Sequence, residues 1–422
     1  MGMPCSEHGW PVSAGRGGRK RLLVIHHDFP GPFRDLLPFW SDMLGWQVVG
    51  IGSEASSGCG DVPWIRYFDR HPPTAATSPH ITTTPGAVRR GEAVARVLLD
   101  LKAQSYAPDV ILADPGAGET LHVKDVFPDA RLVHDCTGHT GRAVQDAAPD
   151  LSVIARCDAG ISPGWWQKCT YPRDFQSRID VIRDGICHAA FGADPSAVVV
   201  TDDGMTLHAE DAVITHVVSA PGGDAGLSGF LRVLGLLQRR HPCRALIVGA
   251  GNDASGWLEQ RMVAACVDPQ RTHFVNSPRP GGIADMLRVS SVHIHMGRPD
   301  RLDRSLLEAM ACGCAMVVAD ESPVREIVRH GINALVVDPH DRDGLVEAVL
   351  RLFDSPLLQA SLRREAKAEI ARSFDAGAAA IRYARVFDGQ PDDHLPPHFL
   401  PAALAGEDVA LHDYAFCPLD TP

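Results

Sequence analysis

Residues 291–320, SVHIHMGRPDRLDRSLLEAMACGCAMVVAD, decide the fold class. Two short apolar runs in this stretch, Ser291–His295 and Ala315–Ala319, have the length and composition of strands buried in a parallel sheet. The segment between them has room for a loop and one helix. The order strand, helix, strand predicts a βαβ unit, in which both strands run in the same direction.

The helix of this unit is predicted over Leu302–Cys312, because its apolar residues recur at helical spacing. Asp303 and Ser305 are both common N-cap residues, and Gly313 is a natural C′ residue that ends the helix. The N-terminus of the helix therefore adjoins the loop after the first strand. Unpaired backbone N–H groups and the helix dipole favour an anion there.

Strands alternate with helices along most of the remaining chain. Further strands are predicted at Arg21–His26, Gln47–Ile51, Asp109–Ala113, Ala130–Val133, Ala159–Ser162, Asp180–Ile182, Ala212–Ser219, Arg244–Val248, His273–Val275 and Ala334–Val337. Further helices are predicted up to Leu44 after the loop Asp28–Phe33, and at about Ala87–Gln104, Leu227–Arg239, Ile283–Val289, Asp343–Phe353 and Ala376–Phe387. This pattern predicts an α/β protein with two doubly wound domains facing a cleft.

The chain divides into four predicted segments. Residues 1–19 form a loose leader that lacks the apolar region of a secretion signal. Residues 20–205 form an N-terminal domain and residues 206–375 a C-terminal domain, which meet near the polar stretch Asp202–Glu210. Residues 376–422 form a last helix and a Pro-rich tail, which could return to the N-terminal domain.

Composition excludes several classes of protein. The net charge of −12, from 40 basic and 52 acidic side chains, argues against nucleic acid as a partner, because phosphate binding needs a basic face. No apolar run approaches the roughly 18 residues of a membrane span. The 11 cysteines contain no C-x-x-C pair and favour reduced thiols over a disulfide framework. We expect a cytoplasmic, multi-domain enzyme with small-molecule substrates, either monomeric or homo-oligomeric.

Two loops in the N-terminal half lie where open α/β sheets bind ligands, beyond the carboxyl ends of strands. In the loop Asp28–Phe33, Gly31 allows a close approach of the backbone to a ligand. The loop Asp114–Thr120 (DPGAGET) places the carboxylates Asp114 and Glu119 around two glycines. A simple turn between a strand and a helix explains each loop about equally well.

The loop and helix at Arg298–Gly313 give a sharper signal. Glu308 lies in the first turns of the helix and could accept hydrogen bonds from two vicinal ribose hydroxyls. Asp300 lies eight residues earlier, where it could reach a sugar. The spacing of two carboxylates alone is weak support, because a solvated helix start looks similar.

The segment LLEAMACG, the strand AMVVAD and the segment PVREIVRHGINALVVDPHD closely resemble the C-terminal half of family-4 retaining glycosyltransferases of the GT-B fold. Glu326 and the turn with Gly331 and Asn333 occur in the family's order. In the N-terminal half, HHDFPGPF, PDVILADPGAGETLHVKDVFPDARL and SPGWWQKCTYPRDFQSRIDVIRDGI look like a branch of this family with its own N-terminal domain. The resemblance covers about residues 20–388.

The resemblance implies two Rossmann-like domains and transfer of a sugar from a GDP- or UDP-sugar, with retained anomeric configuration, no metal and no permanently bound cofactor. The donor would contact Glu308 at its ribose and Asp300 at its sugar. Its diphosphate would face Gly31 and the backbone N–H groups of Leu306 and Leu307, beside Ser305. Its nucleobase would lie in the loop after the strand His273–Val275, at Val275 and Asn276.

Two departures from the family pattern stand out. Ser219 occupies the position where the family commonly has an arginine that holds the diphosphate, so charge would have to come from Arg298, Arg301 or Arg304. Asp114 replaces a histidine that is usual in this branch. The predicted catalytic residues are Asp114, Asp300 and Glu308, and the predicted acceptor-binding residues are His26, Asp28, Asp114 and Glu119, of which Glu119 is the more structural.

Metal sites are less favoured than structural roles. His293 and His295 alternate on one strand without a four-ligand spacing, and Asp341-Arg-Asp343 precedes a helix, so an N-cap explains it better. We therefore expect a glycosyltransferase that acts through oxygen or sulfur on a small polar acceptor, in natural-product (such as antibiotic) or cell-envelope biosynthesis. The alternatives are a non-catalytic nucleotide-sugar-binding partner subunit and a GT-B-type sugar epimerase or phosphorylase.

Overall fold

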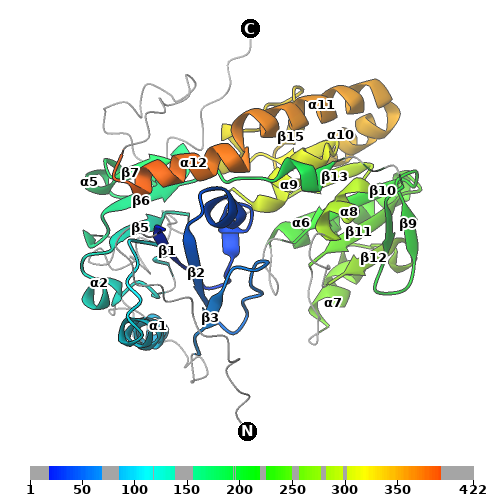
Figure 1. Cartoon of the computed structure of the whole chain (residues 1–422). Coiled ribbons are helices and arrows are strands. Elements are labelled where there is room, and N and C mark those ends of the chain that lie inside the picture. The colour runs from blue at the N-terminus through cyan, green and yellow to red at the C-terminus, as the bar shows by residue number, and fades with distance from the viewer. Residues whose placement is uncertain are drawn as a thin grey trace. The chain divides into compact units, whose positions relative to one another are not determined.

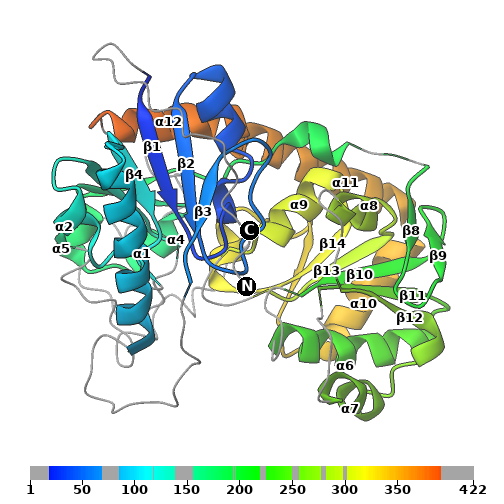
Figure 2. The same ribbon diagram turned by 60° about the horizontal axis from the view of Figure 1, so that its bottom comes forward.

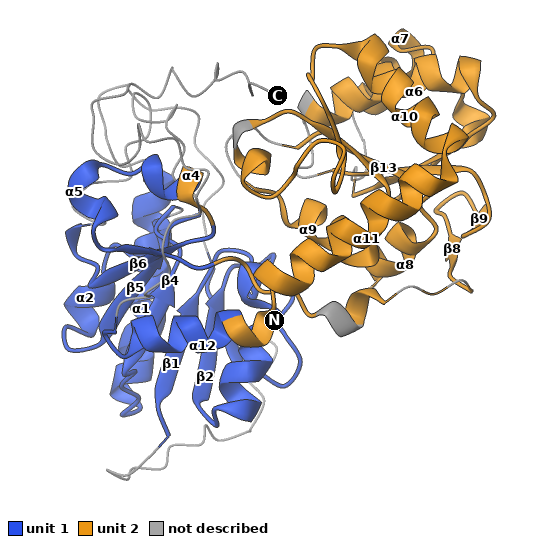
Figure 3. Cartoon of the chain, turned by 90° about the horizontal axis from the view of Figure 1, so that it is seen from above, with its two compact units in different colours: residues 1–163, 167–182, 379–393 blue, residues 164–166, 183–378, 394–422 orange. Residues whose placement is uncertain are grey.

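A computed structural model of the chain describes residues 19–68, 85–116, 118–137, 155–192, 194, 196–218, 225–249, 256–276, 282–297 and 302–390 (Figure 1). These residues fall into two compact units (Figure 3). Unit 1 contains the described residues up to 163 together with 167–182 and 379–390. Unit 2 contains 164–166 and the described residues of 183–378.

Unit 1 is built on a seven-stranded parallel sheet with the strand order β3-β2-β1-β4-β5-β6-β7. Its strands are β1 (Arg21–Ile25), β2 (Gln47–Gly52), β3 (Trp64–Arg66), β4 (Val110–Ala113), β5 (Arg131–Asp135), β6 (Ala159–Ser162) and β7 (Ile179–Val181). The helical segments along this part of the chain are η1 (Gly31–Phe33), η2 (Phe39–Met43), α1 (Pro85–Ala103), α2 (Val123–Val126), α4 (Trp165–Cys169) and α5 (Arg173–Gln176).

Alternation along β1 divides the core of unit 1 between the two faces of the sheet. Leu23 and Ile25 point to the face that α1 covers, where Val94 and Leu98 of the helix are fully buried (Figure 2). Leu22 and its neighbours on alternate positions point to the opposite face and are equally buried. Both faces are therefore covered, as expected for an all-parallel sheet.

Unit 2 is built on a six-stranded parallel sheet with the strand order β12-β11-β10-β13-β14-β15. Its strands are β10 (Val213–Val217), β11 (Arg244–Val248), β12 (Thr272–Val275), β13 (Val292–His295), β14 (Met316–Ala319) and β15 (Leu335–Val337). Its helical segments are η3 (His188–Phe191), α6 (Ala225–Arg240), α7 (Trp257–Ala264), η4 (Pro269–Arg271), α8 (Gly282–Arg288), α9 (Arg304–Cys312), η5 (Ser322–Glu326), α10 (Arg342–Asp354) and α11 (Pro356–Ser373).

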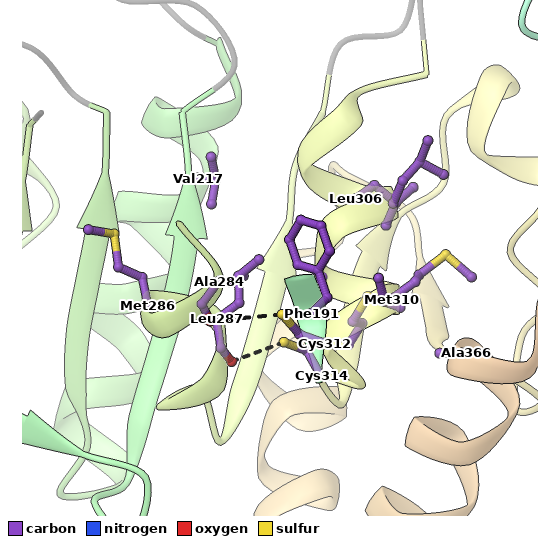
Figure 4. Close-up of a cluster of buried hydrophobic side chains, with 14 of the residues drawn as sticks. Phe191, Val217, Ala284, Met286, Leu287, Leu306, Met310, Cys312, Cys314 and Ala366 are labelled. Carbon is purple, nitrogen blue, oxygen red and sulfur yellow. Dashed lines mark hydrogen bonds between the residues drawn. The ribbon is translucent and has the colours of Figure 1, made fainter. Parts of the chain in front are cut away.

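The two faces of the unit 2 sheet bury separate cores. Ala245 and Ile247 of β11 pack with side chains of α6 and α10, whereas Leu246 and Val248 pack with α8, α9 and α11. Figure 4 shows the second core, in which the thiol of Cys314 donates a hydrogen bond to the carbonyl oxygen of Leu287 over 3.3 Å. Unit 2 is thus a three-layer α/β sandwich, and α9 belongs to one of its outer layers.

The predicted strands are confirmed to within two residues, and the helix predicted at Ala376–Phe387 has these bounds as α12. The helix α9 begins after Asp303, although the Asp303 side chain makes no capping hydrogen bond, and it ends at Gly313 in the left-handed conformation with φ of 74°. Asp341 is confirmed as the N-cap of α10, because its carboxylate accepts the N–H of Gly344 over 2.8 Å.

Two expectations need correction, and one helix has no counterpart among the predicted elements. The helix predicted after the loop Asp28–Phe33 is shorter than expected, because only η2, Phe39–Met43, is a regular helical segment before Leu44, and Pro38 stands at its N-cap. The predicted linker near Asp202–Glu210 contributes to an antiparallel hairpin of β8 (Val198–Val200) and β9 (Thr206–His208). The helix α11 was not predicted, because its buried positions are only Leu362, Ala366 and Ile370, and the turns between them carry mostly charged residues.

The chain passes from unit 1 to unit 2 between Ile182 and Arg183, upstream of the expected boundary at residues 205 and 206. The helix α12 begins in unit 2 and continues in unit 1 from Ala379. There the indole N–H of Trp40 donates to the carbonyl oxygen of Ala380 over 3.1 Å, and the Trp40 ring packs against Tyr383. The predicted leader and most of the Pro-rich tail lie outside the described residues.

Candidate functional site

The candidate donor-binding group lies in unit 2, at the carboxyl edge of the sheet where α9 begins. Glu308, one turn into α9, is 7% exposed, and the Arg304 side chain donates from Nε to its Oε1 over 3.0 Å. The two residues are four apart, so the helix itself sets this ion pair. The carboxylate is therefore held in a fixed direction at the start of the helix.

The first turn of α9 contains a backbone N–H that is used within the turn and a buried hydroxyl. The backbone N–H of Leu306 donates to the carbonyl oxygen of Asp303 over 3.1 Å, so it serves the turn. The Ser305 hydroxyl is buried and has no hydrogen-bond partner among the described residues. Because the positive end of the helix dipole lies there, this end of α9 suits a phosphate group.

Val275 and Asn276, predicted to face the nucleobase, follow β12 at the same edge of the unit 2 sheet. β12 is three strands away from β13, which leads to α9, so the two loops are separated by about 14 Å. The backbone N–H of Asn276 donates to Asp202 over 3.0 Å, and its side-chain Oδ1 is buried without a hydrogen-bond partner among the described residues. An unsatisfied buried acceptor is uncommon and marks a position that a ligand donor could fill.

Four of the predicted site residues cannot be placed. Ser219, Arg298 and Asp300 lie outside the described residues, as does the alternative charge donor Arg301. These positions therefore remain predictions from the sequence. The described part of the donor-binding group consists of Val275, Asn276 and the first two turns of α9.

A second group of predicted residues gathers in unit 1, where β1 and β4 are neighbours in the sheet. His26 follows β1, and its Nδ1 accepts the backbone N–H of Asp28 over 3.1 Å. Its Nε2 lies 4.0 Å from Oδ2 of Asp114, which follows β4. Burial lowers the pKa of His26, although the negative charge of Asp114 opposes this shift.

Gly31 packs closely against the ring of His26. Its φ of 55° is left-handed, and a Cβ at this position would lie 2.5 Å from Cε1 and Nδ1 of the His26 ring. The Asp114 carboxylate is fixed by the backbone N–H of Gly116, which donates to Oδ1 over 2.7 Å. The predicted residues His26, Asp28, Gly31 and Asp114 are thus brought together at one edge of the unit 1 sheet.

Glu119 belongs to a neighbouring buried cluster with two residues that were not predicted from the sequence. The Tyr67 hydroxyl donates to Glu119 Oε1 over 2.6 Å, and His27 Nδ1 lies 3.2 Å from the same oxygen. Burial would raise the pKa of Glu119, but the hydrogen bonds from His27 and Tyr67 hold it below its usual value. A signal for this cluster was present in the sequence, namely the second histidine after β1.

Among the residues that the structure describes, no three or more His, Cys, Asp or Glu side chains form a group that could hold a metal ion. In the same part of the chain, no helix combines the length and apolarity needed to cross a bilayer. Full burial of the His293 side chain lowers its pKa well below the usual value.

Two family models match successive parts of the chain. The model described as glycosyl transferase family 4 group matches residues 44–136 and 139–191, and the model described as glycosyl transferases group 1 matches residues 213–355. The two parallel α/β units correspond to the two Rossmann-like domains of the GT-B fold. The chain belongs to the family-4 glycosyltransferases of this fold.

Two curated relatives are D-inositol 3-phosphate glycosyltransferases. That of Thermobispora bispora is 31% identical over 111 residues, which are 26% of this chain and 26% of the relative. That of Acidothermus cellulolyticus is 29% identical over 264 residues, which are 60% of this chain and 57% of the relative. The similar regions therefore span only about a quarter and just over half of these two relatives.

Solved structures share the fold at low sequence identity. Anabaena Alr3699/HepE in complex with UDP and glucose has a TM-score of 0.65 and 16% identity, and the match covers 88% of this chain and 100% of that chain. Sucrose-phosphate synthase from Thermosynechococcus elongatus has a TM-score of 0.63 and 16% identity, with 88% and 99% coverage. At such identities the likeness concerns the fold alone.

Proposed function

We propose that the protein transfers a glycosyl group from a nucleoside-diphosphate sugar to a small polar acceptor. The observation that carries this proposal is the start of α9, where the buried, oriented carboxylate of Glu308 and the buried Ser305 hydroxyl, which has no hydrogen-bond partner among the described residues, lie at the positive end of the helix dipole. A diphosphate and a ribose need anion-stabilising N–H groups and a carboxylate that accepts from vicinal hydroxyls. Family membership supports the same activity.

Among the possible donors, UDP-sugars have the stronger support. The fold neighbour Alr3699/HepE was crystallised with UDP and with UDP-glucose. A GDP-sugar remains the alternative from the sequence. The relatives' names offer D-inositol 3-phosphate as a first acceptor to try, together with other small molecules that carry a hydroxyl or a thiol.

The proposed chemistry relies on positioning and charge stabilisation. The bond between the anomeric carbon and the diphosphate oxygen breaks, a bond to the acceptor oxygen or sulfur forms on the same face, and the acceptor proton passes to the leaving phosphate. The helix amides and Arg304 would stabilise the leaving diphosphate, and Asp114 would orient the acceptor. This route retains the anomeric configuration and requires no metal.

The replacement Glu308→Gln tests the donor-binding group. It keeps the shape of the side chain but removes the charge, and charge-assisted hydrogen bonds contribute about 1.5–3 kcal/mol, so UDP affinity should fall by about 10- to 100-fold. Calorimetric titration with UDP, with and without Mg²⁺, measures this change, and turnover of UDP-glucose should be lost with it. Glu347→Gln, on the exposed face of α10 in the same unit, is the matched control.

Different results would point to other functions. Unchanged UDP affinity in Glu308→Gln would remove Glu308 from the site. Tight UDP binding by the unaltered protein without turnover of any donor would favour the non-catalytic subunit. Release of free sugar or dependence on inorganic phosphate would favour the epimerase or phosphorylase.

A further inference from the structure

His27 lies at the carboxyl edge of the unit 1 sheet, with one ring nitrogen facing inward. Its carbonyl oxygen accepts the backbone N–H of Ser53 and the hydroxyl of Ser56, each over 3.0 Å, so its main chain is held from two sides. Its side chain is 42% exposed. Its Nδ1 lies 2.9 Å from the Tyr67 hydroxyl oxygen and 3.2 Å from Glu119 Oε1.

The hydrogen bonds of this cluster determine where the His27 proton resides. Tyr67 uses its only hydroxyl hydrogen on Oε1 of Glu119, whose side chain is only 1% exposed, and this hydrogen bond favours the ionised form of the carboxylate. Both oxygens near Nδ1 are therefore acceptors, and Nδ1 must carry a hydrogen. A neutral imidazole carries one hydrogen, so the other nitrogen, Nε2, then has a bare lone pair.

The Nε2 atom has no hydrogen-bond partner among the described residues, and the exposed part of the ring is available to a ligand. A bare imidazole nitrogen accepts one hydrogen bond and donates none, so it selects a group that carries a hydrogen, such as a hydroxyl. His26, the residue before His27, and Asp114, which follows the adjacent strand β4, lie at the same edge of the sheet.

We propose that His27 binds a hydroxyl group of the acceptor substrate through Nε2, and that Glu119 and Tyr67 are positioning residues that direct this lone pair outward. The proposal rests on the proposed glycosyl transfer and adds the class of acceptor, a polyhydroxylated molecule that is held by a hydrogen bond it donates. The same arrangement, in which a buried carboxylate selects one histidine tautomer, controls histidine function in other enzymes.

The cluster makes this binding dependent on pH. The hydrogen bond to Glu119 raises the pKa of His27. As the pH falls through this raised pKa, Nε2 gains a hydrogen and no longer accepts a hydroxyl, so use of the acceptor should be lost on the acid side, starting above the ordinary value of about 6.5. The titratable and charged groups that face His27 are Glu119, Tyr67, Asp28, His26 and Arg90.

The tautomer can be measured without knowing the substrate. In the full chain labelled with ¹⁵N-histidine, the His27 signals are assigned by their loss in His27→Gln. We expect the Nδ1–H form above the pKa, and a shift of the Nε2 resonance when inositol is added as a polyol probe. In Glu119→Gln the amide can donate to Nδ1, so the Nε2–H form should appear, and Tyr67→Phe, which keeps Glu119, should retain the Nδ1–H form.

Turnover separates a hydrogen-bonding role from a structural one. Glutamine can place its carbonyl oxygen near the position of Nε2, whereas asparagine reaches only the position of Nδ1. With UDP-glucose as donor and inositol or D-inositol 3-phosphate as acceptor, His27→Gln should keep kcat/KM within about threefold and lose the acid limb. His27→Asn should lose about tenfold through the KM of the acceptor, the size expected for one hydrogen bond. UDP affinity should not change in either variant, and His122→Gln, a histidine of similar exposure in the same unit, is the control.

Specific results would overturn the proposal. An Nε2–H tautomer in the unaltered protein would contradict the proposed role of His27, whether or not turnover occurs. His27 signals that respond neither to inositol nor to D-inositol 3-phosphate would contradict it as well. Acceptor use that improves as the pH falls would show that the imidazolium binds an anion instead. Absence of turnover with normal UDP binding and a responding His27 would count against glycosyl transfer but not against the His27 site.

Discussion

Replacing Gly31 by alanine tests how tightly the Gly31 backbone packs against the His26 ring. The backbone at Gly31 is left-handed, with φ of 55°, and the added Cβ would lie 2.5 Å from the His26 ring. The ring has little freedom to move, because Nδ1 accepts the N–H of Asp28 and its edge packs against Phe33. Gly45 in the same unit has a similar φ of 64° but no atom within 4 Å of its added Cβ, so Gly45→Ala is a matched control.

The two variants separate backbone strain from steric overlap. Left-handed backbone costs alanine about 1–2 kcal/mol, and this term applies to both positions. Overpacking against a fixed ring adds about 1–3 kcal/mol only at Gly31, so Gly31→Ala should lose about 2–5 kcal/mol of unfolding free energy. Urea unfolding followed by circular dichroism measures the difference between the variants. If Gly31→Ala were no less stable than Gly45→Ala, the close packing of Gly31 on His26 would be refuted.

Two further predictions concern stability. Asn333 is fully buried; its side-chain oxygen accepts the backbone N–H of Arg329 over 2.7 Å, and its amide donates to the carbonyl oxygen of Ile327 over 2.8 Å. Asn333→Ala leaves both backbone groups unpaired, so the free energy of unfolding, measured in urea, should fall by about 2–4 kcal/mol. A loss below about 1 kcal/mol would contradict this role of Asn333. Burial lowers the pKa of His134 to about 4, so below pH 6.5 the unfolded chain binds a proton that the folded one does not. Stability should therefore fall by about 3 kcal/mol from this group between pH 6.5 and 4, and His134→Leu should remove that part of the pH slope; an unchanged slope would show that His134 is not buried in the neutral form.

Local sequence was sufficient where a signal lies within one element. The bounds of α9 follow from apolar spacing and from the residues at its ends, Asp303 and Gly313, and the buried strands follow from their short apolar runs. The helix α11 escaped prediction because Leu362, Ala366 and Ile370 are its fully buried positions, and the two alanine- and charge-rich turns between them carry little periodic signal. The hairpin of β8 and β9 escaped because its strands have only three residues each.

The candidate site residues also fall into two classes, those that local sequence indicates and those that only the folded sheet brings together. Gly31, Asp114 and Glu308 could be proposed from the sequence, because each follows a recognisable strand or lies in the first turns of a recognisable helix. His27 and Tyr67 were not, because 40 residues separate them along the chain and Tyr67 follows a three-residue strand. Their relation to Glu119 exists only because β3, β2, β1 and β4 are consecutive in the folded sheet.

Periodicity and motif order along the chain were enough to establish the fold class and the family, and to propose the segments that carry the donor- and acceptor-binding groups. These properties are local, since strands, helices and their caps depend on residues within a few positions of one another. Tertiary structure alone decided which side chains share a hydrogen bond, and hence that His27 and Tyr67 both lie against the buried carboxylate of Glu119 and lower its pKa. The reason is that burial and the nearest charges set the protonation of a group, and both depend on strand order, which no local pattern specifies.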